Sequence, residues 1–217
     1  MNLEQARFNM VEQQIRPWEV LDQDVLDLLY VVRREEFVPA EYRTLAFSDI
    51  EIPLGDGERM WAPKVEARVL QELALKKTER VLEVGTGSGY FAALLAHCAQ
   101  HVTSVEINPR LKALGEQNLR RQGIDNVSVE SGDAAQGWAA HAPYDAIVLT
   151  GSTPVLPESL LAQLKSGGRL FAIVGDPPVM EARLITRAAE GSVRSVDLFE
   201  TSFPPLRNAL QPNRFSF

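Results

Sequence analysis

Three glycines at alternate positions, Gly85, Gly87 and Gly89, stand between two apolar stretches of the chain. The stretch before them, residues 80–84, is typical of a buried strand, and the stretch after them is typical of an apolar helix. Because glycine has no Cβ atom, the chain can turn sharply there and a ligand can lie against the backbone. The run indicates a nucleotide-binding turn at the carboxyl edge of a parallel sheet, although a tight turn alone can also use glycine.

Acidic residues stand at the ends of the strand patterns. Glu83 comes just before the glycines, and Glu106 ends the next strand pattern about 20 residues after them, where a carboxylate can accept both ribose hydroxyls of an adenosine cofactor. Asp133 follows the strand pattern at 127–131, a place where an aspartate can instead cap the next helix. The glycines and the acids together predict a site for an adenosine-containing cofactor.

The dinucleotide fingerprint G-x-G-x-x-A also has a match, in the run from Gly87 to Ala92. Counted from Gly85, however, the third position of the fingerprint is Tyr90, whose ring is too large for the close helix-to-strand packing required there. NAD is therefore disfavoured, and a nicotinamide-dependent oxidoreductase stays the less favoured alternative.

The run from Glu83 to Gly89 resembles motif I of methyltransferases that bind S-adenosylmethionine, E/D-x-G-x-G-x-G. The resemblance implies that Glu83 lies near the methionine amino group and that Asp133 accepts a hydrogen bond from the adenine amino group. It implies S-adenosylmethionine as the cofactor and S-adenosylhomocysteine as the product. The residues expected to bind the cofactor are Glu83, Gly85, Thr86, Gly87, Gly89, Glu106, Ile107, Asp133, Ala134 and Thr150.

Strand and helix patterns alternate from residue 64 onward, as in parallel α/β proteins. We expect strands at 80–84, 101–106, 127–131, 144–150 and 169–174, and helices at 64–75, 90–97, 109–122 and 157–164. Gly167 and Gly168 turn the chain into the strand at 169–174, and the β-like runs 182–188 and 193–199, joined by residues 189–192, predict an antiparallel hairpin. The expected fold is a doubly wound, mostly parallel seven-stranded sheet, the Rossmann-like fold of S-adenosylmethionine-dependent methyltransferases.

The first part of the chain has another pattern. Helical runs at 3–15 and 22–32 are separated by Pro17, and residues 37–63 are rich in proline, glycine and acids, which indicates an irregular lid or edge outside the core. We expect a single domain over residues 1–217, with N-terminal helices and a lid-like segment at 1–63 and a cofactor-binding α/β core at 64–217.

Almost the whole chain resembles the protein-L-isoaspartate O-methyltransferase family. The similar runs are residues 10–16, 34–39, 81–90, 144–148 and 167–170, together with 202–206, which resemble the closing strand of the family. The resemblance implies methyl transfer to a carboxylate, with isoaspartyl residues of damaged proteins as the acceptors. It also gives Asp145, at the start of the fourth strand pattern, a structural role.

One departure from the family lies on the acceptor side. Where the family carries T-I-S-x-P, with the serine at the reaction centre, this chain has Trp61 in the serine's place and Arg59 in the threonine's. An indole cannot orient a carboxylate as a hydroxyl does. The alternative function is therefore a cofactor-binding paralogue with an altered acceptor or without isoaspartyl activity. In another interpretation Trp61 packs on the sheet, and Ser152 or Thr150 replaces the serine.

The substrate site is expected near this departure. A carboxylate needs no base to attack a sulfonium, so the chemistry depends on alignment and exclusion of water, and no catalytic residue is assigned. The residues expected to bind the substrate are Trp61, Pro63, Gly151 and Ser152.

Composition excludes several classes of partner. The chain has 29 Asp and Glu against 22 Lys and Arg, and a net charge of -7 opposes binding to nucleic acid. Cys98 is the single cysteine and the three histidines form no ligand-spaced cluster, so neither a disulfide framework nor a metal site is expected. No apolar run approaches the roughly 18 residues of a membrane span. We expect a cytoplasmic protein whose partners are a small methyl donor and a peptide or protein carboxylate; no oligomeric state follows from these patterns.

Overall fold

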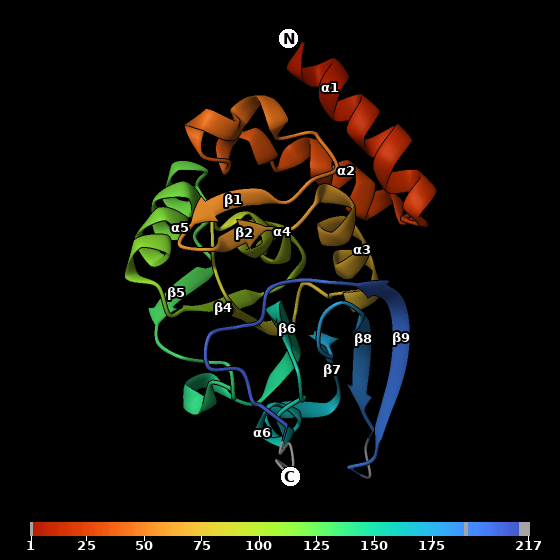
Figure 1. The fold of residues 1–217 in the computed structure, drawn as a ribbon, viewed down its shortest axis with the longest axis vertical. Coiled ribbons are helices and arrows are strands. Elements are labelled where there is room, and N and C mark those ends of the chain that lie inside the picture. The colour runs from red at the N-terminus through yellow and green to blue at the C-terminus, as the bar shows by residue number, and fades with distance from the viewer. Residues whose placement is uncertain (1, 189–190, 213–217) are drawn as a thin grey trace.

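The main feature of the computed structural model, which describes residues 2–188 and 191–212, is a sheet of seven strands (Figure 1). The strand order is β5-β4-β3-β6-β7-β8-β9; the strands from β5 to β7 are parallel, and β8 and β9 are antiparallel. The strands are β3 (Arg80–Val84), β4 (His101–Glu106), β5 (Val127–Ser131), β6 (Tyr144–Thr153), β7 (Leu164–Val174), β8 (Met180–Arg187) and β9 (Val193–Thr201). The predicted sheet and its antiparallel C-terminal strands are confirmed, while Ala189 and Glu190 of the predicted connection lie outside the described residues.

Both faces of the sheet are covered, as a doubly wound fold requires. Neighbouring residues of β6 alternate between two hydrophobic clusters, Val148 in the larger one and Ile147 in the smaller one. The larger cluster contains side chains of α3 (Pro63–Leu73), α4 (Tyr90–Cys98) and α5 (Pro109–Arg121), and the smaller one contains Leu160 of α6 (Glu158–Ala162). The strand β6 is therefore apolar on both sides, which explains its continuous apolar run from Ala146 to Leu149.

The strand order reverses beside β3. The chain passes from β3 to β4 and β5 in one direction and then returns to place β6 on the other side of β3. In open parallel sheets, ligands bind at the carboxyl ends of the strands beside such a reversal. The register pairs Val84 with both neighbouring strands, so that Gly85, Glu106 and Thr150 meet at this edge.

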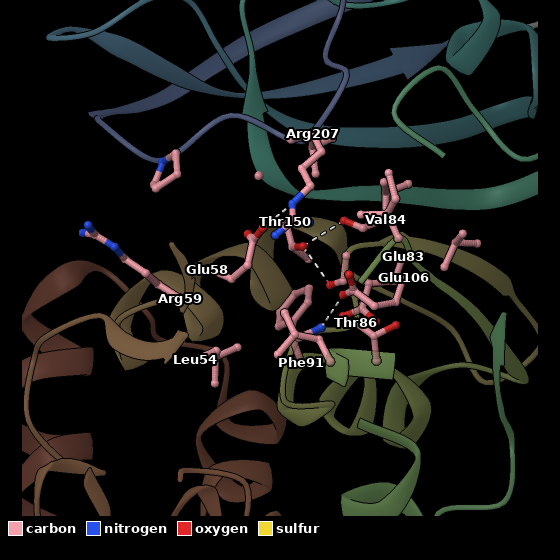
Figure 2. A pocket seen from close by; sticks show the side chains of 18 of the residues that line it. Leu54, Glu58, Arg59, Glu83, Val84, Thr86, Phe91, Glu106, Thr150 and Arg207 are labelled. Carbon is pink, nitrogen blue, oxygen red and sulfur yellow. Dashed lines mark hydrogen bonds and ion pairs between the residues drawn. The ribbon is translucent and has the colours of Figure 1, made fainter. Parts of the chain in front are cut away.

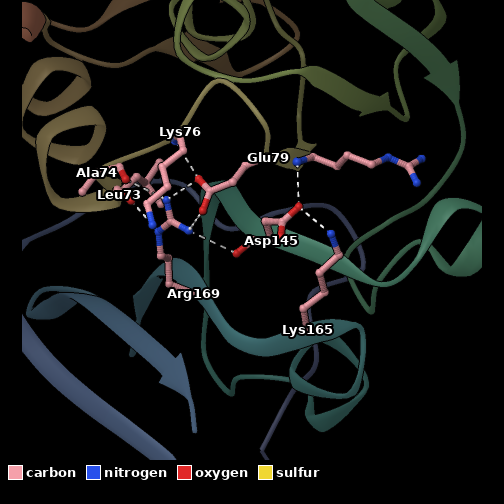
Figure 3. Close-up of polar contacts among 8 residues, drawn as sticks. Leu73, Ala74, Lys76, Glu79, Asp145, Lys165 and Arg169 are labelled. Carbon is pink, nitrogen blue, oxygen red and sulfur yellow. Dashed lines mark hydrogen bonds and ion pairs between the residues drawn. The ribbon is translucent and has the colours of Figure 1, made fainter. Parts of the chain in front are cut away.

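A polar cluster closes the opposite, amino end of the strands (Figure 3). Arg169 donates to the Glu79 carboxylate at 2.7 Å and to the Ala74 carbonyl at 3.0 Å, which joins β7 to the end of α3. Asp145, the second residue of β6, accepts a hydrogen bond from the first backbone N–H of β3 and pairs with Lys165, both at 2.8 Å. Asp145 thus ties strands together at the end remote from the glycine turn, in agreement with a structural role.

The N-terminal segment forms part of the core. It contains α1 (Leu3–Met10), which continues as a π-helical turn (Val11–Ile15), then α2 (Gln23–Val31) and the hairpin of β1 (Ile52–Gly55) and β2 (Glu58–Met60). The prediction that residues 37–63 lie outside the core is wrong, because Phe37, Ile52 and Trp61 are buried in the larger cluster. Their apolar side chains follow no helix or strand period, since prolines and glycines interrupt the segment.

Two boundaries near the C-terminus also differ from the prediction. Gly167 and Gly168 lie inside β7, which begins at Leu164, instead of preceding it. Residues 202–206 form no strand; Pro205 makes a single bridge with Ser152, because prolines lack the N–H that a strand ladder needs. No helix in the part of the chain that the structure describes is long and apolar enough to cross a membrane.

Candidate active site

A cleft of about 900 Å³, partly open to solvent, lies at the carboxyl ends of β3, β4 and β6 (Figure 2). One end is formed by the glycine turn and the residues that follow β4 and β5. Leu54 lies against Gly87 of this turn, and the rest of the cleft is lined by residues that include Trp61, Phe91 of α4 and the segment 203–207 after β9. The cleft therefore joins the predicted cofactor residues to the predicted acceptor side.

The glycine turn has the backbone that its sequence predicts. Gly85 has a φ of +100° and Gly87 a φ of +54°, values that side chains rarely adopt. A Cβ atom at Gly85 would collide with the hydroxyl of Thr150, which donates to the carbonyls of Val84 and Gly85 at 2.8 Å each. Gly85 and Gly87 both line the cleft, and the side chains of Thr150 and Leu54 pack where their Cβ atoms would stand. Gly89 differs, because it begins α4 against Gly115 of α5 and does not line the cleft.

Glu83 is fully buried beneath this turn. Its Oε2 accepts a hydrogen bond from Ser104, whereas its Oε1 has no hydrogen-bond partner in the structure. Burial raises the pKa of Glu83 to about 8; the Ser104 hydrogen bond lowers it and the charge of Glu106 raises it. A buried carboxylate oxygen without a partner is costly, so this oxygen fits the ammonium group of a methionine moiety.

Glu106 is held in one orientation at the end of β4. Its Oε2 accepts from the Gly87 backbone N–H and its Oε1 from the Asn108 backbone N–H, both at 2.9 Å. Each carboxylate oxygen can accept a second hydrogen bond, so both oxygens can still accept a ribose hydroxyl. The fixed carboxylate fits the adenosine half of the cofactor, and the neighbouring Ile107 lines the same part of the cleft.

Asp133 follows β5 and lines the cleft, as Glu106 does at the end of β4. Its Oδ1 accepts from the Ala135 backbone N–H at 3.0 Å, and its Oδ2 accepts from the side-chain amide of Asn208 at 2.8 Å. Asp133 therefore stabilises a turn, not the helix that the alternative interpretation expected. Asp133 and the buried Ala134 both line the cleft; their binding to the cofactor stays a prediction.

Trp61 lies at the acceptor end and is only 4% exposed. Its ring meets Phe91, Phe171 and Phe203 edge-on, with centroids 5.3, 5.8 and 6.0 Å away. Its indole N–H has no hydrogen-bond partner in the structure. Trp61 packs on the sheet and forms a wall of the cleft, as one of the sequence interpretations expected.

Of the other residues predicted to bind the acceptor, one lines the cleft and two do not. Gly151 lines the cleft, but Pro63 and Ser152 do not. Pro63 begins α3, and the buried Ser152 donates its hydroxyl to the Phe203 carbonyl at 2.8 Å. The hydroxyl of Thr150 is also engaged with backbone carbonyls. Neither hydroxyl is therefore free to replace the family's serine.

Sequence reasoning missed a buried ion pair behind Trp61. Arg34 donates to Glu66 at 3.0 Å, to the Ala46 carbonyl at 3.1 Å and to the Trp61 carbonyl at 2.6 Å. Burial raises the pKa of Glu66 to about 7, while the charge and hydrogen bond of Arg34 lower it. Arg34 fixes the backbone that carries Trp61. The sequence singled out Arg34 only as part of the run 34–39 that resembles the family, and no spacing of residues indicated its partners.

Sequence reasoning also missed Glu58 and Arg207, which line the acceptor end. They are paired at 2.8 Å although 149 positions separate them in the chain. Both belong to segments without periodic patterns, so no sequence signal could have joined them.

Comparisons with known proteins agree with this geometry. The family model described as "Protein-L-isoaspartate(D-aspartate) O-methyltransferase (PCMT)" matches residues 5–211. A protein-L-isoaspartate O-methyltransferase 1 from Syntrophobacter fumaroxidans is 40% identical over 91% of this chain and 96% of its own. A protein-L-isoaspartate O-methyltransferase from Methanoculleus marisnigri is also 40% identical, over 92% of this chain and 90% of its own.

Two solved structures share the fold. One, a protein-L-isoaspartate O-methyltransferase, has a TM-score of 0.77 and 26% identity over 94% of this chain, which spans 65% of that protein's length. The other, a Plasmodium falciparum structure described as a putative protein-L-isoaspartate O-methyltransferase in complex with S-adenosyl-L-homocysteine, has a TM-score of 0.78 and 23% identity over 91% of this chain and 96% of its own.

Proposed function

This chain belongs to the protein-L-isoaspartate(D-aspartate) O-methyltransferase family, and on that premise we propose that it methylates the free carboxylate of isoaspartyl residues in damaged proteins. The methyl donor is S-adenosylmethionine and the product is S-adenosylhomocysteine. The observation that supports binding of this donor most directly is the buried Oε1 of Glu83, which has no hydrogen-bond partner and lies beside the glycine turn. The matching family and both relatives are described as methyltransferases and not as nicotinamide-dependent oxidoreductases.

The residues of the cleft supply a position for each part of the donor. Glu83 would hold the ammonium group, Glu106 the ribose hydroxyls and Asp133 the adenine amino group. Gly85 and Gly87, which line the cleft, allow the positive φ angles of the tight turn beside the donor. The remaining predicted cofactor residues that line the cleft are Thr86, Ile107, Ala134 and Thr150. Gly89 is left out, because it packs between helices.

The donor supplies an activated methyl group on a sulfonium. The acceptor carboxylate attacks it, so that a C–O bond forms while the C–S bond breaks, and no proton needs to move. The protein's part is to align the two molecules and to exclude water. An apolar wall at the acceptor end can exclude water; it is formed by Trp61, Phe91 and Phe203.

A second candidate function is cofactor binding without isoaspartyl turnover. It is favoured by Trp61, which puts a packed indole where the family has a serine. The test is methyl transfer from labelled S-adenosylmethionine to two peptides that differ only in an isoaspartyl or an aspartyl linkage. We expect label in the isoaspartyl peptide alone. Donor binding without transfer to either peptide would favour the second candidate.

We also propose a cytoplasmic protein that acts on peptides or proteins and not on nucleic acid. The net charge of -7 and the acidic lining of the cleft support this choice of acceptor, because both repel phosphate. The single Cys98 supports a reducing compartment. Label recovered in protein but not in added RNA would agree with it.

A further inference from the structure

We propose that Arg207 binds the carboxylate of the methyl acceptor, in the role that Trp61 cannot fill. This inference rests on the proposed function and adds to it a residue that selects anionic acceptors. Arg207 lines the same cleft as Glu83 and Thr150, and Figure 2 shows its side chain reaching toward Thr150.

The charges around the cleft favour such a residue. The cleft is lined by the acids Glu58, Glu66, Glu83, Glu106 and Asp133. Arg59 and Arg207 are the only arginines or lysines among its lining residues in the described chain. Arg34 pairs with Glu66, and the ammonium group of the donor would pair with Glu83. The charges that an incoming carboxylate meets are therefore those of Glu58, Glu106 and Asp133. A cation close to its path offsets their repulsion.

Of the two arginines, only Arg207 is directed into the cleft. Arg59 pairs with Glu51 at 3.2 Å and points away from the other side chains in Figure 2. Arg207 uses only its Nε, which donates to Glu58 at 2.8 Å, and its two terminal nitrogens have no hydrogen-bond partner in the described chain. A planar guanidinium with free N–H groups suits a carboxylate, which it can bind with two parallel hydrogen bonds.

The backbone holds Arg207 beside the end of β6. Leu206 donates its N–H to the Ser152 carbonyl at 2.9 Å, and Ser152 donates its N–H to the Pro204 carbonyl at 3.0 Å. The Leu206 side chain packs so closely on Gly151 that a Cβ atom there would lie 2.8 Å from it. Arg207 therefore starts from a fixed point, next to the edge where Gly151 lines the cleft.

In this structure Glu58 accepts a hydrogen bond from the Nε of Arg207. Glu58 lies on β2, three positions before Trp61, and its side chain is 33% exposed. Because Glu58 accepts only from Nε, a substrate carboxylate can bind the two terminal nitrogens while Glu58 stays in place. The negative charge of Glu58 then lies close to the bound acceptor and weakens its attraction to Arg207, which predicts opposite effects of removing the two side chains.

The test is calorimetric binding of two short peptides to the protein saturated with S-adenosylhomocysteine. One peptide carries an isoaspartyl residue, and in the other its free carboxylate is a carboxamide. We expect the unaltered protein to prefer the carboxylate by about tenfold, as for one charge-assisted contact. Arg207→Gln should remove the preference, and Glu58→Gln should raise the affinity for the carboxylate peptide severalfold. Arg59→Gln is the matched control and should leave the preference unchanged.

The outcomes separate this inference from the proposed function. A preference that survives Arg207→Gln, an equal weakening of both peptides, or weaker carboxylate binding in Glu58→Gln would overturn the role of Arg207. If the preference depends on Arg207 but labelled S-adenosylmethionine gives no methylated peptide, the inference stands and the proposed function fails.

Discussion

Ser104 donates its hydroxyl to Oε2 of Glu83, and this leaves Oε1 of the same buried carboxylate without a partner. The hydroxyl of Thr86 lies 2.6 Å from that of Ser104, so a chain of hydroxyls fixes the carboxylate from one side. This network fixes the position of Oε1, which remains an acceptor without a hydrogen bond. The predictions on the donor end of the cleft depend on this atom.

Glu83→Gln should weaken binding of S-adenosylhomocysteine by about tenfold to a hundredfold, because a hydrogen bond to a charged group is worth roughly 1.5–3 kcal/mol. Calorimetry measures the change directly. Glu58→Gln is the matched control, since it removes an acid from the acceptor end of the same cleft. Equal weakening in both variants would show that overall charge, and not a contact at Glu83, determines affinity.

The affinity for S-adenosylhomocysteine should rise with pH up to about 8. The pKa of Glu83 in the free protein is raised to about 8, first by burial, and an ammonium ligand lowers it by favouring the charged form. Below pH 8 binding must therefore release a proton, and affinity falls by up to about tenfold per pH unit. Titrations in buffers of different ionisation enthalpy measure the proton. No proton release at pH 7 would contradict the assignment of Glu83.

Gly85→Ala should abolish detectable binding of S-adenosylhomocysteine and lower the melting temperature. Its φ is +100°, and the new methyl group would collide with Thr150. Gly123→Ala is the control, because Gly123 has a φ of +69° with open space around it and should cost only about 1 kcal/mol of stability. Unaltered binding in the Gly85 variant would mean that the donor lies elsewhere.

Trp61→Ser should destabilise the protein so much that an effect on acceptor binding cannot be separated from the loss of stability. Replacing a buried tryptophan by a small residue costs about 3–5 kcal/mol, here on the order of 10 °C in melting temperature. Trp61→Phe keeps an aromatic ring and removes an N–H that has no partner, so turnover should stay within about twofold of the unaltered protein. If Trp61→Phe binds the donor normally but loses turnover, the indole N–H contacts the acceptor, contrary to this account.

Asn208→Ala should tighten binding of S-adenosylhomocysteine severalfold. The amide of Asn208 donates to the carboxylate of Asp133 that is proposed for the adenine amino group. The same oxygen can accept a second hydrogen bond, but a weaker one, so removal of the first should strengthen the contact with adenine. Arg207→Gln, one residue away, does not touch Asp133 and should leave donor affinity unchanged. Weaker binding in the Asn208 variant would show that Asn208 supports the adenine site instead of weakening it.

The donor end of the cleft was predictable because its signals are local. The alternation of glycines identifies the turn at 85–89, and acids at the ends of strands identify Glu83, Glu106 and Asp133. The topology of parallel sheets then brings these ends together at one edge. The strand pattern and the site therefore follow from the same few runs of sequence.

The acceptor end was less predictable because it is assembled from distant segments. The packing of Trp61 depends on Phe91, Phe171 and Phe203, which belong to three different parts of the chain. Arg207 enters the cleft only because the chain turns back toward β6 after β9, a path that no periodic pattern records. The exclusion of Ser152 likewise depends on a carbonyl brought by that path.

The choice of cofactor is tested most directly by calorimetric titration of the unaltered protein with S-adenosylhomocysteine and, separately, with NAD. We expect saturable binding of one S-adenosylhomocysteine per chain and no heat of binding for NAD. A protein that bound NAD, or that gave no binding heat with S-adenosylhomocysteine at any pH from 6 to 9, would contradict this choice.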